Sequence, residues 1–402
     1  MYTITGKYNE AVVFSDYETM ENTAYSQIMQ LCNQEFVKGA KIRIMPDVHA
    51  GAGCTIGTTM TITDKIVPNL VGVDIGCGME VACLDEKRIN LPELDKAINQ
   101  NIPCGFEIRK NGHKFNDLID LEDLRCKRQA NLDRARKSIG TLGGGNHFIE
   151  AGKDSDENLY FVVHSGSRHL GTEVAGYYQN EAYRRLNKNS KKDIDKLIKE
   201  LKKQGRANEI QKTIKEVKEN ETSDIPKSLA YAEDDLFDDY IHDMKIVQKF
   251  ADINRKAMVE EIRKNMKFDI IEQFTTVHNY IDTNTMILRK GAVSAKDGEK
   301  LIIPMNMRDG SLICVGKGNP DWNFSAPHGA GRLMSRSEAR QSLTLSEFKK
   351  TMDGIYTTTL TKDTIDEAPM AYKPMEDITK HIYDTVEICK IVTPIYNFKA
   401  AE

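Results

Sequence analysis

The sequence predicts one large α+β domain, of mixed helices and strands, with a helical insertion. Three observations lead to this prediction. Short apolar runs typical of β-strands alternate with glycine-rich segments, a long amphipathic helix lies between two such regions, and no Pro-, Gly- or Ser-rich linker divides the 402 residues. The 40% hydrophobic and 29% charged content is typical of a folded globular protein.

Strands are expected where apolar runs meet polar, glycine-containing segments. Three blocks have this texture, at residues 41–82, 141–171 and 275–336. Functional side chains tend to collect where strands pass into such loops. The apolar runs expected to form strands are Ile42–Met45, Thr58–Ile62, Leu70–Val73 and Leu159–Val163.

A charged helical excursion is expected at about residues 183–235, where Lys and Glu accompany apolar residues at helical spacing. An acidic, proline-containing break at its end precedes a long amphipathic helix, whose apolar stripe runs from Phe237 to Ile262. Asn254 falls on that stripe. A buried amide needs hydrogen-bond partners, so Asn254 is either a satisfied core residue or part of a site lining.

Composition sets limits on location and partners. The net charge of −4 does not suggest a nucleic-acid partner, so any RNA site must be a local patch. The chain has no apolar signal region and no run of about 18 apolar residues, which indicates a cytoplasmic protein without membrane contact. Its 8 cysteines are scattered, so no disulfide framework is expected.

A carboxylate and a thiol, Asp74 and Cys77, lie three residues apart in the densest motif of the first block. Glycines on both sides of Cys77 allow a tight turn, so the two side chains could converge on one cation. The alternative is a structural turn with an ordinary buried cysteine. Upstream, the turn-prone segment Met45–Gly51 adds Asp47 and His49.

The second block places Gly143–Gly145 before Asn146 and His147. Consecutive glycines expose backbone N–H groups that can cradle phosphate. His147 can bind a metal, and Asn146 or Glu150 can bond a ligand. An ordinary loop is the alternative interpretation.

Two histidines are accompanied by small residues and an arginine, whose planar fork suits phosphate. His164 follows a strand near Arg168, and a core histidine is the alternative there. His328 lies among small residues, with Arg332 four positions later. A neutral imidazole nitrogen can attack the α-phosphorus of a nucleotide if cations bind the developing charge.

Taken together, the ordered motifs resemble those of the RNA-splicing ligase RtcB family from Met45 to Lys399. The resemblance implies an RtcB-like mixed fold with central β-sheets and glycine-rich active-site loops, a single catalytic domain over residues 1–402, and a monomer. The motifs that carry it are Asp74–Gly78, Gly144–Phe148, His164–Arg168, His278–Tyr280, Arg289–Gly291 and His328–Arg332.

The resemblance implies two manganese ions bridged by the thiolate of Cys77. Thiolate and imidazole ligands bind zinc or cobalt more tightly than manganese, so the metal's identity rests on the family alone. One ion would be held by Cys77, His147 and His278, and the other by Asp74, Cys77 and His164.

The resemblance further implies that GTP guanylylates His328, with Asp47 in a supporting role. The GMP would then pass to an RNA 3′-phosphate, itself formed from a 2′,3′-cyclic phosphate where necessary, and a 5′-hydroxyl would displace it. Asn146 and Glu150 would contact the GMP, and Lys399 the guanine. The residues assigned to phosphates or RNA ends are Arg168, Lys290 and Arg332, with Asn254 included if it lines the site.

The chain departs from the family at Pro304–Arg308, where relatives commonly carry Pro-Gly-Ser-Met-Gly. This segment is expected to border the nucleotide, so Asn306 and Arg308 are candidate contacts. An exposed loop arginine is the alternative for Arg308.

Two other functions compete with ligation. A binuclear metal phosphoesterase would open cyclic phosphates without sealing and would not need His328 as a nucleophile. A non-catalytic factor could instead bind RNA ends, using the Lys-rich stretch Arg184–Lys218, although its interleaved acidic residues favour a solvated helical face.

Overall fold

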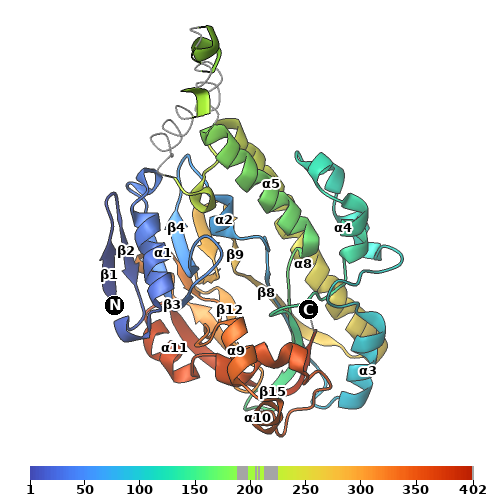
Figure 1. The fold of residues 1–402 in the computed structure, drawn as a ribbon. Helices are drawn as coiled ribbons and strands as arrows, with labels where there is room; N and C mark the ends of the chain where they lie inside the picture. Colours follow the sequence, from blue (N-terminus) through green and yellow to red (C-terminus); the bar gives the residue numbers. More distant parts are fainter. Residues whose placement is uncertain (188–197, 204–205, 207–208, 212–224, 401–402) are drawn as a thin grey trace.

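The structure is a computed structural model that describes residues 1–187, 198–203, 206, 209–211 and 225–400. Two large β-sheets form its centre, and helices cover them (Figure 1). The predicted α+β class is therefore confirmed. No helix of these described residues is both long enough and apolar enough to cross a membrane.

The first sheet has six strands, and all neighbouring pairs are antiparallel except β2 and β3. The strands predicted at Ile42–Met45 and Thr58–Ile62 are confirmed as β3 and β4. In spatial order the strands are β1 (Tyr2–Thr5), β2 (Glu10–Val13), β3 (Ile42–His49), β4 (Ile56–Thr61), β10 (Ile287–Lys290) and β9 (Asn279–Asp282).

The second sheet has seven antiparallel strands, and a short pair, β11 (Ala292–Ser294) and β14 (Ser325–Pro327), forms a third. The strand predicted at Leu159–Val163 is confirmed as β7. In spatial order the seven strands are β12 (Lys300–Asn306), β13 (Gly310–Gly316), β15 (Val386–Lys399), β6 (Phe148–Lys153), β7 (Leu159–Ser165), β5 (Gly78–Leu84) and β8 (Ile270–Val277).

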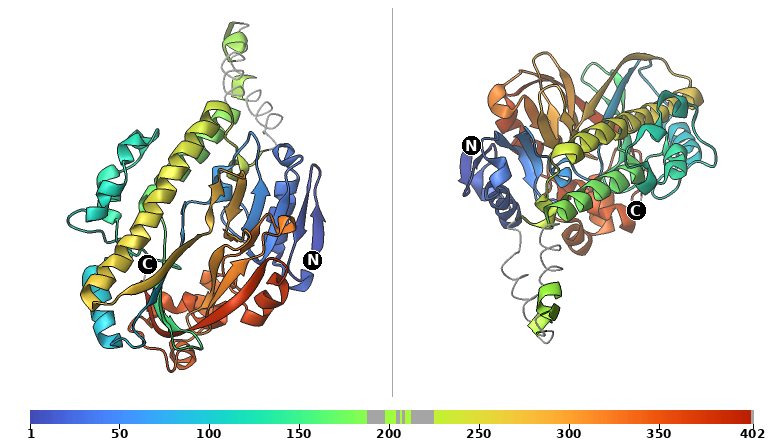
Figure 2. Two further views of the ribbon diagram at one scale, coloured as in Figure 1. Left: turned by 180° about the vertical axis from the view of Figure 1, so that it is seen from behind. Right: turned by 90° about the horizontal axis from the view of Figure 1, so that it is seen from above.

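Two long helices, α5 (Arg168–Leu186) and α8 (Asp234–Met266), lie side by side (Figure 2). The predicted amphipathic helix is confirmed as α8, which also packs on β5 and β7. Its apolar stripe enters two cores, with Val247 in the first and Met258 in the second. Each fully buried side chain of this kind stabilises the fold by about 1.5–3 kcal/mol.

The remaining α-helices are short and surround the sheets (Figure 1). The predicted excursion at 183–235 begins within α5 and ends at the start of α8, and most of its middle lies outside the described residues. Its helical character stays a prediction. The short helices are α1 (Asn22–Cys32), α2 (Pro68–Val71), α3 (Leu91–Asn101), α4 (Leu132–Ser138), α9 (Arg336–Ser342), α10 (Leu345–Thr351) and α11 (Met375–Ile382).

The strand predicted at Leu70–Val73 is wrong. Residues Pro68–Val71 form α2, because the fixed φ of Pro68 suits the first turn of a helix and Gly72 ends it with a φ of 102°. The apolar composition of this run reflects the burial of Leu70 and Val71 in the first core. Asp74 consequently follows a helix, and the turn that carries it leads into β5 at Gly78.

Candidate active site

One cysteine and three histidines meet at one end of the second sheet. Cys77 directly precedes β5, His147 precedes β6, His164 lies on β7, and His278 directly follows β8. The strands β8, β5, β7 and β6 are consecutive neighbours, and their register pairs Gly78 with both Ser165 and Val277. Strand pairing therefore brings together side chains that are far apart in the sequence.

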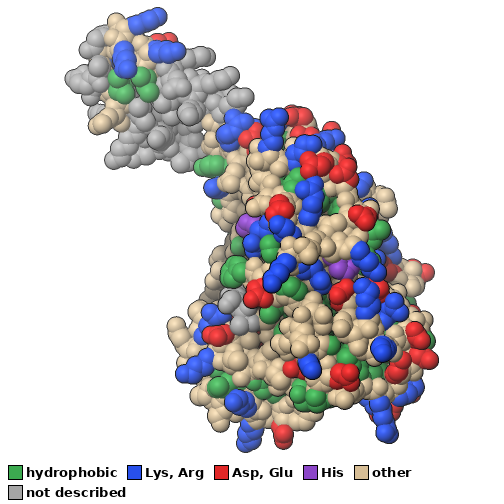
Figure 3. Space-filling view, turned by 90° about the vertical axis from the view of Figure 1, so that its right-hand side faces the viewer, with side chains coloured by type: hydrophobic (Ala, Val, Ile, Leu, Met, Phe, Trp, Pro, Cys, Tyr) green, Lys and Arg blue, Asp and Glu red, His purple; other side chains and the backbone are tan. Residues whose placement is uncertain are grey.

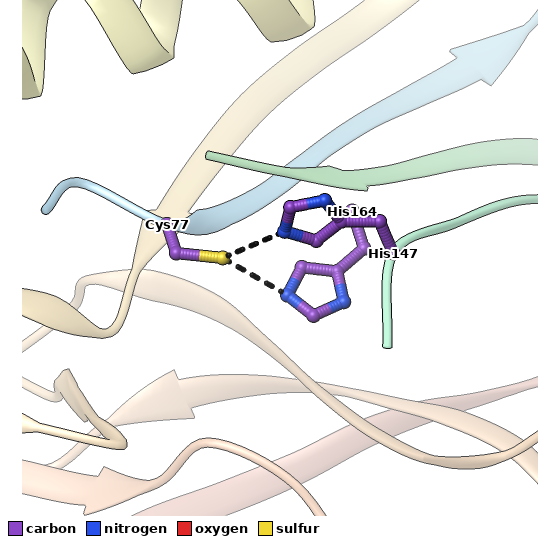
Figure 4. A group of neighbouring side chains, drawn as sticks. All are labelled: Cys77, His147 and His164. Carbon is purple, nitrogen blue, oxygen red and sulfur yellow. Dashed lines mark hydrogen bonds between the residues drawn. The ribbon is translucent and has the colours of Figure 1, made fainter. Parts of the chain in front are cut away.

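The Cys77 thiol lies between two imidazoles (Figure 4). Its Sγ is 3.5 Å from Nε2 of His147 and 3.3 Å from Nε2 of His164. Nε2 of His147 also lies 3.0 Å from Oδ2 of Asp74. The other oxygen of Asp74 accepts hydrogen bonds from the backbone N–H and the hydroxyl of Ser167, at 2.8 and 3.1 Å. The buried thiol and imidazoles and the partly exposed carboxyl of Asp74 thus form one group.

This group fits a metal ion by its chemistry. The ligand atoms of Cys77, His147 and His164 all lie within 4.8 Å of one another. Nδ1 of His164 donates to the Asn146 carbonyl at 3.0 Å, which leaves the Nε2 lone pair facing the thiol, as in many histidine ligands. Burial and the neighbouring Asp74 raise the pKa of Cys77, so a thiolate here needs a compensating cation.

His278 extends the group toward His328. Its ring centroid is 5.2 Å from that of His164 and 4.9 Å from that of His328. Its Nδ1 is buried without a hydrogen-bond partner among the described residues. Burial lowers the pKa of both His164 and His278, which keeps them neutral and able to bind a cation. All five predicted ligands therefore gather here, and their division between two ions stays a prediction.

His328 is held by the fully buried carboxyl of Asp47. Nδ1 of His328 lies 2.6 Å from Oδ2 of Asp47, which also accepts the backbone N–H groups of His328 and Gly329, at 3.1 and 3.3 Å. Because a carboxylate accepts, Nδ1 carries the proton and the Nε2 lone pair is free. Gly331 makes this approach possible, since a Cβ at its φ of +74° would come within 2.5 Å of the Asp47 carbonyl oxygen.

A cavity of about 500 Å³ opens beside His328, a volume within the range of small-ligand sites. His49 also lines it, and burial lowers the pKa of that imidazole to about 4. The predicted site residues in its wall are Asn146, Glu150, His164, Asn306, His328, Arg332 and Lys399.

A charged network closes the far end of this cavity. Glu367 accepts hydrogen bonds from Lys399, from Arg332 at 3.3 Å and from the Tyr372 hydroxyl at 2.6 Å. Burial opposes its charge, but Lys399 and two arginines lower the pKa of Glu367 to about 2. Sequence analysis did not predict Glu367 or Tyr372 as site residues, because neither lies in a glycine-rich motif.

Glu150 has one oxygen bonded to Asn397 at 3.1 Å, while its buried Oε1 has no hydrogen-bond partner within the described part of the chain. Burial raises the pKa of Glu150 to about 8, although Asn397 and Lys399 act in the opposite direction. The carboxyl is therefore held protonated near neutral pH. It can donate a hydrogen bond to a ligand in the cavity.

We expect Glu150→Gln to stabilise the ligand-free protein increasingly as pH rises. The pKa of an exposed glutamate is about 4.3, whereas that of Glu150 in the folded protein is about 8. The protonated carboxyl of Glu150 therefore stabilises the folded state fully below about pH 4.3. This stabilisation is lost as pH rises through about 8. Glutamine does not ionise and avoids the loss. The melting temperature of the variant minus that of the parent should grow between about pH 5 and 9. A difference independent of pH would contradict the assignment.

Three residues predicted to contact RNA or phosphate, Arg168, Asn254 and Lys290, do not line this cavity. Asn254 is fully buried, accepts from the N–H groups of Gly140 and Thr141, and donates to the Thr141 carbonyl and to two oxygens at the end of β7. This favours the satisfied-core interpretation over the site lining. Lys290 is buried, and its Nζ donates to the carbonyls of Ala52 and Asn69 at 2.9 and 2.8 Å.

The departure at Pro304–Arg308 forms the end of β12 and the turn after it. Asn306 lines the cavity, but Arg308 points its guanidinium at Asp309, with hydrogen bonds of 2.6 and 2.9 Å. A ligand phosphate would have to compete with that carboxylate. The predicted contact of Arg308 stays a prediction, to be tested by GTP and RNA binding to Arg308→Ala, where a real contact should cost about ten- to a hundredfold in affinity.

Comparison with known proteins decides the family. The sequence model described as tRNA-splicing ligase RtcB matches residues 27–400, nearly the whole chain. The chain belongs to the RtcB family. The resemblance seen in the motifs is thereby confirmed.

Named relatives of this RtcB-family chain match it over most of their length. RNA-splicing ligase RtcB1 of Escherichia coli strain ATCC 25922 is 30% identical, with 92% of each chain covered. RNA-splicing ligase RtcB of E. coli K12 is 29% identical over 92% of each. The tRNA-splicing ligase RtcB of Aeropyrum pernix is 25% identical over 92% of this chain and 90% of its own.

Proposed function

We propose that this protein is an RNA ligase that joins 3′-phosphate or 2′,3′-cyclic phosphate ends to 5′-hydroxyl ends through GMP bound to His328. The observation that carries the proposal is the pairing of His328 with the buried Asp47, beside a candidate metal group and at the wall of a nucleotide-sized cavity. The RNA- and tRNA-splicing ligases among its family relatives support RNA as the substrate.

In the first step, Nε2 of His328 attacks the α-phosphorus of GTP. A P–N bond forms, the bond from the α-phosphorus to the bridging oxygen breaks, and pyrophosphate leaves. Asp47 accepts the Nδ1–H throughout, so it orients the ring and stabilises the positive charge that develops on it. Metal ions held by the Asp74, Cys77 and histidine group would supply positive charge for the phosphate oxygens.

In the later steps the GMP moves to RNA and is released. An oxygen of the RNA 3′-phosphate attacks the phosphorus on His328, which frees the imidazole and forms an RNA–GMP anhydride. The 5′-hydroxyl then attacks the 3′-phosphorus, losing its proton, and GMP leaves. A cyclic phosphate must first be opened by water, because only a 3′-phosphate monoester offers the attacking oxygen. These steps account for both end types.

The cavity wall suits a guanine nucleotide. Glu150, as a protonated carboxyl, and Lys399 offer donors, and Glu367 adds a carboxylate at the same end of the cavity. Guanine presents carbonyl acceptors and N–H donors, so a mixed set of this kind can recognise it. Asn146 and Arg332 lie in the wall with His328 and can bond the phosphates and ribose.

We expect Asp47→Asn to slow GMP attachment by about 10²–10⁴-fold while GTP binding changes little. Asparagine keeps the shape of Asp47 but removes the charge that stabilises the imidazolium and offers an N–H group in competition with that of Nδ1. Single-turnover labelling with GTP measures the rate, and equilibrium binding measures affinity. Equal losses in both would mean that Asp47 only maintains the cavity.

The function itself is tested with GTP labelled at the α-phosphorus, manganese, and RNA carrying defined ends. Ligation predicts label on the protein, then an RNA–GMP species, then a joined product. A phosphoesterase would open the cyclic phosphate without retaining label, and a binding factor would do neither. The relatives named tRNA-splicing ligase make cleaved tRNA halves the first substrate to try, with nicked RNA as the alternative. A cytoplasmic location and a monomeric state stay predictions.

A further inference from the structure

A second cavity, of about 420 Å³, lies behind the glycine loop that carries His147. The same loop borders both cavities: Asn146 lines the first, and Gly144 and Gly145 line the second. Gly143 of this loop lies against both Arg168 and His147. A Cβ added to it would come within 1.9 Å of the Arg168 guanidinium and 2.6 Å of Nδ1 of His147. The glycine loop therefore separates the second cavity from the candidate metal group.

Two arginines in this cavity bond to neutral oxygens, although the more distant carboxylate of Asp74 also attracts Arg168. Arg168 donates to the Thr141 hydroxyl at 3.0 Å and to the Gly105 carbonyl at 2.6 Å. Arg134 donates to the Phe106 carbonyl at 3.1 Å. Neither forms an ion pair with any acidic residue in the described part of the chain. Cations bonded to neutral carbonyls keep their full attraction for an anion.

Phe106 stands at the mouth of the same cavity with its side chain in water. It is 81% exposed, although large apolar side chains are normally buried. Its turn is fixed to the glycine loop by the Gly105 N–H, which donates to the Gly143 carbonyl at 3.0 Å, and by the bond from Arg134. The Phe106 backbone is thus fixed at the cavity, and its exposed ring belongs to none of the hydrophobic cores of the described residues.

We propose that this second cavity binds single-stranded RNA next to the end being joined, with a base stacked on Phe106 and the adjacent phosphate bound by Arg134. An exposed aromatic ring beside unpaired arginines matches what unpaired nucleotides offer, a flat base and a charged backbone. The inference rests on the proposed function, because it takes RNA as the substrate. It assigns roles to Phe106 and Arg134, which lie outside the nucleotide cavity.

The footprint is short. Farther along α5 the next groove is lined by Glu173, Glu181 and Arg184, and Arg184 is already ion-paired with Glu181, so it offers phosphate no unpaired cation. On the face that carries α4, basic and acidic side chains are mixed (Figure 3). Attraction for RNA is therefore concentrated at the cavity, and one or two nucleotides fill its volume. A strand bound there places its end near His147 and the metal group.

The test compares Phe106→Ala with the parent in binding a fluorescent RNA oligonucleotide. Loss of one stacked base should weaken affinity by about five- to a hundredfold. An oligonucleotide with abasic sites at its terminal positions should bind the parent more weakly but should bind the variant as the intact oligonucleotide does. Separate oligonucleotides ending in a 3′-phosphate or a 5′-hydroxyl show which strand uses the site. Phe106→Trp should restore binding.

Tyr383→Ala is the matched control, because Tyr383 is another aromatic residue, 59% exposed and outside both cavities. Phe106→Ala binding RNA as tightly as the parent and this control would overturn the proposal, as would equal sensitivity of parent and variant to abasic sites. Labelling of His328 by GTP without RNA should be unchanged in Phe106→Ala. Absence of labelling in the parent would instead count against the proposed function, whatever the RNA affinities.

Discussion

Replacement of His328 by alanine is expected to abolish covalent attachment of GMP and ligation of 3′-phosphate ends. Among the described histidines that line the cavity, His328 is the one whose ring nitrogen bonds a buried side-chain carboxylate, whereas the amine of Lys399 is paired as a cation with Glu367. The expected loss is complete within detection, because the intermediate has no other site. The measurement is acid-labile, hydroxylamine-insensitive label from GTP, the behaviour of a phosphorus–nitrogen bond to imidazole.

A matched control is His242→Ala, since His242 lies on α8 outside the cavity and contacts only surface groups of Asp123, its carbonyl at 3.1 Å and its carboxylate at 3.4 Å, among the described residues. It should label normally. His328→Ala should still seal an RNA whose 3′-phosphate already carries GMP, because that step does not use the imidazole as a nucleophile. Label persisting on His328→Ala would refute the assignment, and loss of its melting transition would show a structural role instead.

Replacement of Cys77 by serine is expected to remove most of the bound metal. The thiol is the atom that lies against both His147 and His164, at 3.5 and 3.3 Å, so every arrangement of the group uses it. Since even changes to groups behind a ligand weaken metal affinity by about 10–100-fold, loss of the ligand itself should exceed about tenfold. Metal content after gel filtration and a competition titration both measure it.

Cys83→Ser and Cys104→Ser are the matched controls. Cys83 is also buried on β5, and Cys104 is partly buried near the second cavity, but neither belongs to the candidate metal group of the described residues. Both should keep their metal. Equal loss in all three variants would mean that the turn at Cys77 is structural. Melting curves with and without manganese separate loss of metal from loss of fold.

Patterns of apolar residues over a few positions correctly predicted one helix and several strands that depend on such short-range spacing. The apolar stripe of α8 and the strands β3, β4 and β7 follow from spacing over a few residues, and each was confirmed. The strand prediction at Leu70–Val73 was wrong because a buried strand and a buried helical turn can have the same short apolar run. Pro68 and Gly72 supplied the local signal for the helix.

Partnerships across the chain could not be read in the same way. The sequence allows two interpretations of Asn254 because its partners, Gly140 and Thr141, lie more than a hundred residues away. The resemblance implies a phosphate contact for Lys290, whereas in the structure its ammonium group donates to carbonyls of the first block. A motif specifies the type of residue at a position but does not specify which groups its side chain contacts in the folded protein.

The chain's motifs alone predicted the family and the residue types expected to carry the chemistry, because a turn that needs glycine, or a side chain that binds a cation or phosphate, requires a particular residue type at its position. Tertiary structure decided which of them meet. Asp47 reaches His328 across 281 residues, and Glu367 reaches Lys399 from a segment without any motif. Such contacts depend on the pairing and packing of sheets, whose free energy is spread over the whole core, so no short stretch of sequence can encode them.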